Sequence, residues 1–300
     1  MPKQNYDYST GQDIVDEHRR IVADDGDTSI DAEQDDSLLY ILNLLKREVI
    51  NMPFAGLNIG PHFIQPTRRA WDFMEDDKPF SFIAKTALAA DITAGATTTT
   101  IDSGTGWDST NGAFVTYDAN GTYERLTFTT RSSGSITGMS AAGIDHDDGD
   151  DAEKLYALPA DFGRPLKLLV AGQEYTQTED QPLTEQFSVW NGFLWVPRNL
   201  GVTSGTLKYA MKATDLVTLD STMDTPKELD PYFIERLNAR NYRNNGNPQA
   251  DIERAERAAA SHLSSFLVYT THSSNQRVTL VRGPISSPTT TCPPVVWPNR

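Results

Sequence analysis

The order of two hydrophobic patterns is the feature that most constrains how this chain can fold. Apolar residues recur at helical spacing in residues 37–50 and again after residue 230, whereas short alternating runs separated by turn residues fill the stretch from about 80 to 215. Helical spacing predicts amphipathic helices, and alternation predicts half-buried strands. The order predicts an α+β fold: a body of N-terminal and C-terminal helices, with inserted antiparallel β modules and extended terminal arms.

The N-terminal part of the predicted body covers residues 37–83. Asp35 and Asp36 supply an acidic start for a helix that runs to Ile50, and Pro53 is expected to end it. A second, short helix is expected between residues 61 and 71. The first helix is apolar on more than one side, which predicts that it packs against several neighbours.

The C-terminal part of the predicted body covers residues 216–272. Asp230-Pro231 and Asn247-Pro248 each place a capping residue before proline, a combination that starts helices. Phe233, Leu237 and Tyr242 are expected to line the inner face of the first of these helices. The second shows apolar residues three or four apart, as an amphipathic helix requires.

The middle of the chain predicts two β regions. Residues 84–152 are expected to form an inserted small β module, and residues 153–215 a second β region. Asn191-Gly192 lies between two alternating runs and predicts a type I′ hairpin over residues 187–196. Asn120-Gly121 gives a similar signal inside the first module.

The two ends of the chain differ sharply in charge. Residues 1–36 hold 11 of the 41 acidic residues and only three basic ones, which predicts an acidic flexible arm. Residues 273–300 contain five prolines and three arginines but no acidic residue. Proline excludes a helix there, so the segment is expected to be an extended arm that binds a partner or, alternatively, a strap over its own chain.

Composition excludes several classes of protein. The net charge of −15 argues against a protein that binds nucleic acid by neutralising phosphates. The single cysteine, Cys292, excludes a disulfide framework and a multi-thiolate metal site. Neither a membrane-spanning apolar run nor a signal peptide is visible, so no membrane contact is expected.

No motif in the sequence predicts catalysis, and the chain is not expected to be an enzyme or to hold a cofactor. Asp161-Phe162-Gly163 matches the kinase metal-binding triplet but lacks every accompanying kinase motif. The acidic stretch 145–151 fails the spacing of an EF-hand, which leaves a solvated loop or an irregular cation site as alternatives. We therefore expect no catalytic, cofactor or metal residues.

Four stretches, taken in order, resemble the head-to-tail adaptor or connector proteins of tailed bacteriophages. They are the helix at 37–50 with a short helix up to Trp71; the run Y-A-L-P-A-D-F at 156–162; the hairpin and strand up to Tyr209 followed by Thr214-Asp215-Leu216; and the two-helix segment 226–266. The module at 84–152 is similar to a β unit common in phage structural proteins. The large β insert and the two terminal arms depart from the family pattern.

The resemblance implies a virion structural protein of the phage neck, made in the host cytoplasm. It implies a ring of twelve subunits below the portal that joins the portal to a tail, nozzle or terminator protein and lets DNA pass without specific binding. Acidic walls would repel the passing phosphates. Three sets of residues are implicated: a portal-binding arm (Arg277, Val278, Leu280, Arg282, Ile285, Trp297), subunit packing (Leu39, Leu42, Leu45, Val49, Ile252, Leu263, Phe266) and a tail-facing hairpin (Trp190, Asn191, Gly192, Trp195).

Two other function classes stay open at this point. Tryptophan and tyrosine side chains of the β regions could bind a host glycan, as in a tail or decoration protein. Abundant carboxylates also leave open a glycan hydrolase that uses a pair of them. The adaptor hypothesis requires ring oligomers. The glycan-binding hypothesis requires a β region that binds without the helices, and the hydrolase hypothesis requires two essential carboxylates in one cleft.

Overall fold

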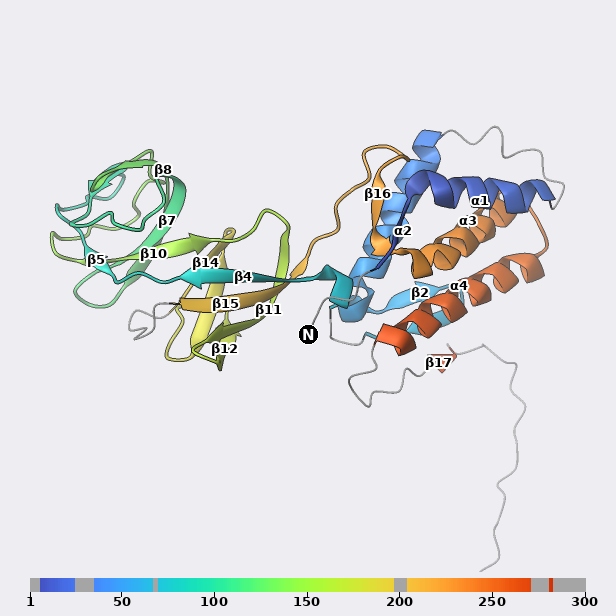
Figure 1. Cartoon of the computed structure of the whole chain (residues 1–300). Helices are drawn as coiled ribbons and strands as arrows, with labels where there is room; N and C mark the ends of the chain where they lie inside the picture. Colours follow the sequence, from blue (N-terminus) through green and yellow to red (C-terminus); the bar gives the residue numbers. More distant parts are fainter. Residues whose placement is uncertain (1–5, 25–34, 67–69, 197–203, 271–280, 283–300) are drawn as a thin grey trace, which may run out of the picture. The chain divides into compact units, whose positions relative to one another are not determined.

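The computed structural model describes residues 6–24, 35–66, 70–196, 204–270 and 281–282, which divide into two compact units (Figure 1). A helical unit is built from both ends of the chain, Met1–Met74 and Ala213–Arg300. A β unit is built from Glu75–Lys212. Each unit has its own hydrophobic core.

The described residues of the helical unit form four α-helices and several short strands. The helices are α1 (Gly11–Asp24), α2 (Asp35–Ala55), α3 (Asp230–Asn244) and α4 (Gln249–Thr270). The strands and turns of 3-10 helix are β1 (Tyr8–Thr10), β2 (Leu57–Ile59), β3 (His62–Ile64), η2 (Asp72–Met74), β16 (Thr222–Pro226), η3 (Lys227–Leu229) and β17 (Val281–Arg282).

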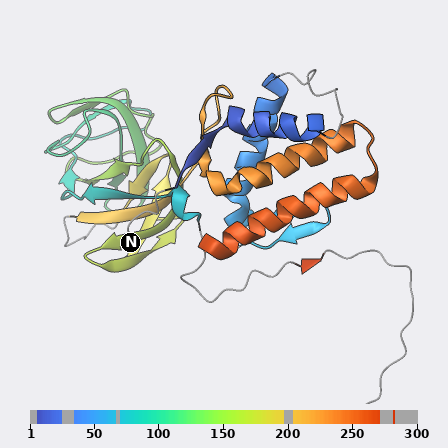
Figure 2. The same ribbon diagram turned by 45° about the vertical axis from the view of Figure 1, so that its right-hand side comes forward.

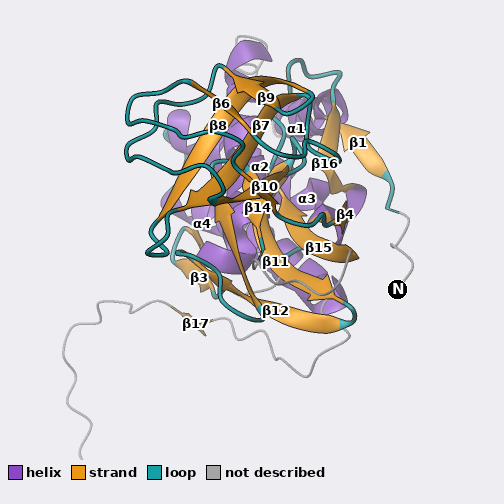
Figure 3. Cartoon of the chain, turned by 90° about the vertical axis from the view of Figure 1, so that its left-hand side faces the viewer, coloured by secondary structure: helices purple, strands orange, loops and turns teal. Residues whose placement is uncertain are grey.

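The β unit is a single mixed sheet of twelve strands, whose strands are drawn as arrows in Figure 3. The strands are β4 (Glu75–Ser81), β5 (Thr86–Ala87), β6 (Thr98–Thr100), β7 (Thr110–Tyr117), β8 (Tyr123–Ser132), β9 (Ser135–Thr137), β10 (Asp151–Ala157), β11 (Phe162–Val170), β12 (Gln173–Thr178), β13 (Gln186–Trp190), β14 (Phe193–Trp195) and β15 (Ser204–Met211). Their order is β4-β15-β11-β12-β13-β14-β10-β7-β8-β9-β6, with β5 also paired to β10.

The predicted fold class is wrong, because strand is the larger share of the structure. The structure is 37 % strand and 30 % helix, and its dominant element is the twelve-stranded sheet rather than a helical body with inserted modules. The sheet is also not purely antiparallel, since β12 and β13 run parallel. The sequences of β4, β10 and β12 are charged or rich in glutamine. They therefore lack the regular apolar alternation from which a strand is predicted.

The two expected β regions share one sheet and one core. Strand β10 pairs with β7 on one side and with β14 on the other, so the expected boundary at residues 152 and 153 falls inside a strand. Trp195 of β14 is buried in a cluster with Val115 and Tyr117 of β7. Strand β7 is consequently covered on both faces, since Phe114 packs into a second cluster on the opposite side.

The C-terminal helices α3 and α4 form a side-by-side pair (Figure 2). The predicted inner face of α3 is confirmed, because Phe233, Leu237 and Tyr242 are all buried. The predicted stripe of α4 is confirmed as well: Ile252, Ala255, Ala259, Leu263 and Phe266 are buried.

Helix α2 continues through Pro53 to Ala55, so the expected stop at this proline is wrong. Proline has no N–H to donate, and this would leave the carbonyl of Val49, four residues earlier, without its helical partner. The buried indole N–H of Trp71 donates to that oxygen instead, at 2.7 Å. A tertiary hydrogen bond therefore replaces the helical one. The stretch from 61 to 71, expected to be helical, contains β3 instead.

Residues 8–24 are folded against the helical unit and are not part of a flexible arm. Strand β1 pairs with β16, and the hydroxyl of Ser9 donates to the carboxylate of Asp230 at the start of α3. On α1, Ile14, Val15 and Val22 are buried. Buried His18 lies with its Nδ1 2.8 Å from Oδ1 of Asn238 on α3. Asp13 and Asp16 of α1 are exposed, which explains why the segment's composition suggested disorder.

The hairpin prediction at Asn191-Gly192 is confirmed. Both residues have positive φ, +46° and +80°, as a type I′ turn requires, and β13 pairs with β14 across it. Strand β4 lies at the sheet edge, where Pro79 can be accommodated because only one side of the strand must donate hydrogen bonds.

We expect a cavity in one core to destabilise one unit only. Phe114→Ala removes a fully buried ring of the β unit, and the matched Phe233→Ala does the same in the helical unit. Each change should cost about 3–5 kcal/mol in its own unit. Hydrogen exchange by mass spectrometry would show protection lost in 75–212 for Phe114→Ala and in α3 and α4 for Phe233→Ala. Loss of protection in both units from one variant would contradict the division.

Asp230 should make stability fall as pH rises from about 4 to about 6. Burial raises its pKa from 3.8 to about 6, so over this range the folded state binds more protons than the unfolded state. Asp230→Asn cannot titrate, and it should gain stability relative to the native chain across that window. Asp13→Asn is the control, because hydrogen bonds from Thr10 lower the pKa of Asp13. Urea unfolding at several pH values measures both; parallel profiles for Asp230→Asn and the native chain would contradict the assignment.

Candidate interaction surfaces

Within residues 6–24, 35–66, 70–196, 204–270 and 281–282, no group of three or more His, Cys, Asp or Glu could hold a metal ion. Among the same residues no helix has the length and apolar character needed to cross a membrane.

The acidic loop at 145–151 uses its carboxylates to hold its own backbone. Asp145 accepts from the N–H of Ala94 at 2.7 Å, and Asp150 accepts from the N–H of Asp147 at 3.0 Å. His146 is buried, with Nε2 3.3 Å from Glu124 and Nδ1 3.7 Å from Asp150. These contacts give the loop a structural role that the sequence search for a cation site did not consider.

The residues expected to pack between subunits lie in the core of their own chain. Leu42, Leu45, Val49, Ile252, Leu263 and Phe266 are buried, and Leu39 is half-buried. Side chains buried inside one chain cannot contact a neighbour. The prediction selected the most apolar face of each helix, and this is the face that the helical unit uses for itself.

The opposite face of α2 presents exposed apolar side chains that the sequence analysis missed. Tyr40 is 69 % exposed and Leu44 is 41 % exposed. They lie four residues apart, so they share one side of the helix with Asn43 and Arg47. We call Tyr40 and Leu44 the α2 face. Exposed apolar residues of this kind can be recognised as a candidate contact surface only after the buried face of the helix is known.

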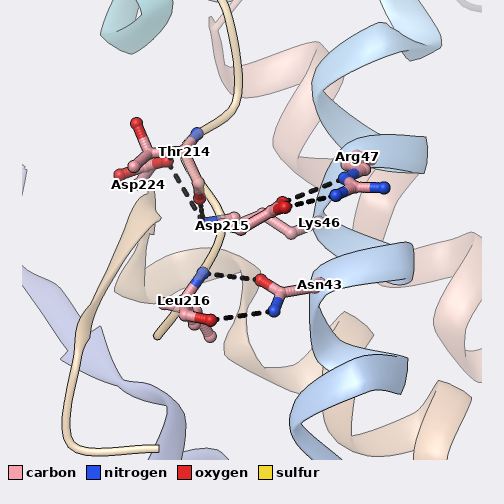
Figure 4. A network of polar contacts seen from close by, with 7 residues as sticks. All are labelled: Asn43, Lys46, Arg47, Thr214, Asp215, Leu216 and Asp224. Carbon is pink, nitrogen blue, oxygen red and sulfur yellow. Dashed lines mark hydrogen bonds and ion pairs between the residues drawn. The ribbon is translucent and has the colours of Figure 1, made fainter. Parts of the chain in front are cut away.

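Next to the α2 face, three polar side chains of the helix bind the chain segment that returns from the β unit (Figure 4). Asn43 donates to the carbonyl of Leu216 at 3.0 Å and accepts from its N–H at 2.7 Å. Arg47 makes a two-point contact with the carboxylate of Asp215. We call this set, with Lys46 and its partners, the clasp.

Lys46 is the buried member of the clasp. Its side chain is 0 % exposed; its ammonium donates to the carbonyl of Thr214 and lies 3.2 Å from Oδ2 of Asp224. The same oxygen of Asp224 accepts from the N–H of Thr214 at 2.9 Å. One buried cation therefore links α2 to two points of the returning segment, while Val217 beyond it is 83 % exposed.

The exposed ion pair of the clasp differs from the buried one in its surroundings. The hydrogen bond from Arg47 lowers the pKa of Asp215, and the same bond raises the pKa of Arg47. Both side chains are about half exposed, so solvent screens their attraction. The fixed position of the segment is therefore assigned to Lys46 and Asn43.

The β unit carries an aromatic surface on one face of its sheet. Trp190, Phe193 and Tyr123 are half-buried and pack against buried Trp195. The ring centroids of Tyr123 and Trp195 are 5.1 Å apart at an interplanar angle of 60°. The structure thus brings the predicted hairpin residues Trp190 and Trp195 together with Tyr123 of β8, while Asn191 and Gly192 lie exposed at the turn.

Arg125 lies among these rings. Its guanidinium carbon is 5.3 Å from the ring centroid of Trp190 and 5.8 Å from those of Tyr123 and Trp195. At the rim, the hydroxyl of Tyr123 donates to the exposed carboxylate of Asp180. This bond raises the pKa of Tyr123 and lowers that of Asp180. We call Tyr123, Arg125, Trp190, Phe193 and Trp195 the aromatic surface.

The expected portal-binding arm lies almost wholly outside the described residues, which is the case for Arg277, Val278, Leu280, Ile285 and Trp297. Arg282 belongs to β17, whose two residues pair antiparallel with β3, Arg282 opposite His62. This pairing is the contact expected of a strap over the chain's own body.

Replacing Lys46 by methionine should loosen the returning segment. The change keeps the apolar stem but removes the part-buried hydrogen bond to the carbonyl of Thr214 and the ion pair with Asp224, so it should cost about 1–3 kcal/mol in the helical unit. Arg47→Met removes only an exposed pair and should cost much less. Urea unfolding followed by exchange protection at 213–224 measures both. Equal losses for the two variants would contradict the role of Lys46.

Comparison with known proteins gives little. No family model and no curated protein matches the chain. Among solved structures, the tailspike of Acinetobacter baumannii bacteriophage AP22, determined in complex with capsular saccharide, is similar over 26 % of this chain and 15 % of its own, with 11 % identity and a TM-score of 0.21. The neighbour is a phage protein, but a likeness of this size carries no argument about the fold or the function of this chain.

Proposed function

We propose that the chain is a structural protein of a phage virion, a head-to-tail adaptor that joins the portal to the tail. The resemblance of the ordered sequence stretches supports this proposal, and one structural observation carries it. The chain makes two separately packed units, one from its two ends and one from its middle. A protein that joins two different partners needs two such surfaces.

In this proposal the helical unit contacts neighbouring copies and the portal. The α2 face offers Tyr40 and Leu44 for such a contact, in place of the apolar residues that the unit buries. Copies related by a rotation that closes would form a ring, and the resemblance implies twelve. The β unit then meets the tail, nozzle or terminator protein.

The charge of the chain fits a position beside passing DNA. A net charge of −15 repels phosphates, so an acidic wall would let DNA pass without holding it. The virion neck, between capsid and tail, is the location that this proposal implies. The proposal involves no cofactor and no reaction.

Charge on the α2 face should prevent assembly without unfolding the chain. Leu44→Glu and Tyr40→Glu replace exposed side chains, so each should change stability by less than about 0.5 kcal/mol while blocking apolar contact. Leu183→Glu is the matched control, since Leu183 is 65 % exposed in the β unit. Negative-stain microscopy and native mass spectrometry of the chain mixed with purified portal measure ring formation.

The expected result is rings for the native chain and for Leu183→Glu, and none for the two α2 variants. Rings that persist in both α2 variants would remove the α2 face from the contact. A native chain that stays monomeric with portal present would overturn the adaptor proposal itself.

A second candidate function, binding of a glycan by the β unit, is favoured by the aromatic surface. Half-buried Trp190, Phe193 and Tyr123 leave part of their rings open on one sheet face. Aromatic faces of this kind can pack against the C–H face of a sugar ring. This candidate requires the β unit alone to account for binding, whereas the adaptor proposal requires both units.

A further inference from the structure

Arg125 is an arginine without an acceptor. Within the described residues, its guanidinium makes no hydrogen bond and no ion pair, and it lies over the rings of Tyr123, Trp190 and Trp195. The carboxylate of Asp180 is near enough to interact with its charge. An arginine side chain has five N–H donors in a planar fork that matches a carboxylate. Half-burial among three rings holds this fork in place and leaves its donors unused.

A second donor in the same cluster also lacks an acceptor. The indole Nε1 of Trp195 is buried and has no hydrogen-bond partner among the described residues. Buried polar groups are ordinarily paired, so an unpartnered donor requires an explanation. A ligand on the surface can reach the donors of half-buried Arg125, whereas Nε1 of Trp195 lies beneath that surface.

The partly open rings define what else the ligand must have. Trp190 and Phe193 lie opposite each other at the hairpin and are both half-buried, and Tyr123 is half-buried on β8. Such rings pack best against a flat, weakly polar surface. A pyranose ring that carries a carboxylate has both required features, a C–H face for the rings and two acceptor oxygens for the arginine.

The sheet around the aromatic surface favours a ring ligand over an extended peptide. Strands β13 and β14 are paired on both sides, with β12 and with β10, so the hairpin offers no free strand edge. Binding of a peptide by strand addition needs such an edge. The surface instead presents side chains from a sheet face.

We propose that the aromatic surface is a binding site for an acidic saccharide, in which Arg125 holds the carboxylate and Trp190, Phe193 and Tyr123 pack against the sugar ring. The site lies wholly within the β unit, and the proposal rests on the second candidate function, glycan binding, rather than on the adaptor role. Asp180 at the rim accepts from Tyr123 and interacts with Arg125 through its charge alone, so the N–H donors of Arg125 stay available to a ligand's carboxylate.

The test uses the full-length chain and defined probes. Oligomers of galacturonate, glucuronate and N-acetylneuraminate are titrated by calorimetry, each beside its neutral methyl ester, and a triglutamate peptide is titrated under the same conditions. Arg125→Gln removes the fork. Lys167→Gln removes a cation of the same unit that is paired with Glu174, and it serves as the matched control.

At least one acidic oligomer should bind, with its methyl ester about 10- to 100-fold weaker, as expected for the loss of a charge-assisted pair. Arg125→Gln should weaken the acid by a similar factor and leave the ester unchanged, whereas Lys167→Gln should have no effect. Since the acid and its ester are compared on the native chain, the result holds even if Arg125→Gln fails to fold.

Three outcomes would overturn the proposal, and they are distinguishable from one another. Equal binding of acid and ester would remove the role of Arg125 but leave glycan binding in place. Binding of triglutamate as tight as that of the sugars would show a general carboxylate site rather than a saccharide site. No binding of any sugar, acid or ester, would overturn both this inference and the glycan-binding candidate.

Discussion

The antiparallel pairing of β4 with β15 is the constraint on which the rest of the structure depends. Glu75, the first residue of the β unit, lies opposite Ala210, two residues before its end. The points where the chain enters and leaves the β unit are thereby held next to each other. This allows segments on either side, more than 130 residues apart in sequence, to fold as one helical unit. The clasp then attaches the returning segment to α2, with buried Lys46 as its central contact.

Local sequence patterns predicted the elements whose conformation is set by residues within the element itself. Asn191-Gly192 can adopt the two positive φ angles of a type I′ turn, so these two residues were enough to predict the hairpin. The spacing of Ile252, Ala255 and Ala259 likewise predicted the buried face of α4. The same reasoning failed at Pro53, because the donor that compensates for proline, Trp71, lies 18 residues further along the chain. No local pattern contains that information.

The fold class failed for a related physical reason. Strand pairing is set by hydrogen bonds between distant segments, and polar strands can join a sheet when their neighbours bury one face. Strand β10 begins in an acidic loop, yet it joins β7 to β14 and merges two expected modules into one sheet. Residues 8–24 show the same effect in a helix: an acidic composition suggested disorder, while Ile14, Val15 and Val22 suffice to dock α1.

The candidate surfaces were harder to predict than the core. Apolar periodicity finds the residues that a chain buries for itself, which is why Leu42 and Leu263 were selected and why Tyr40 and Leu44 were not. Part of the aromatic surface could be predicted from the sequence, since Trp190 and Trp195 flank a recognisable turn. Arg125 could not be predicted as its cation, because it reaches the tryptophans only through the sheet order β14-β10-β7-β8.

The use of cations in this acidic chain gives Arg125 its significance. The chain has 26 basic residues against 41 acidic ones, so carboxylates outnumber cations. Lys46, Arg236 and Lys154 each reach a carboxylate on a distant segment, as Asp224, Glu48 and Asp108 show. Half-buried Arg125 differs from these three cations, because within the described residues it lies over three aromatic rings and forms no ion pair, with Asp180 near enough to interact through its charge alone. Aromatic rings stabilise a cation but accept none of its N–H donors, so the exposed donors of Arg125 remain open to an acceptor from outside the chain.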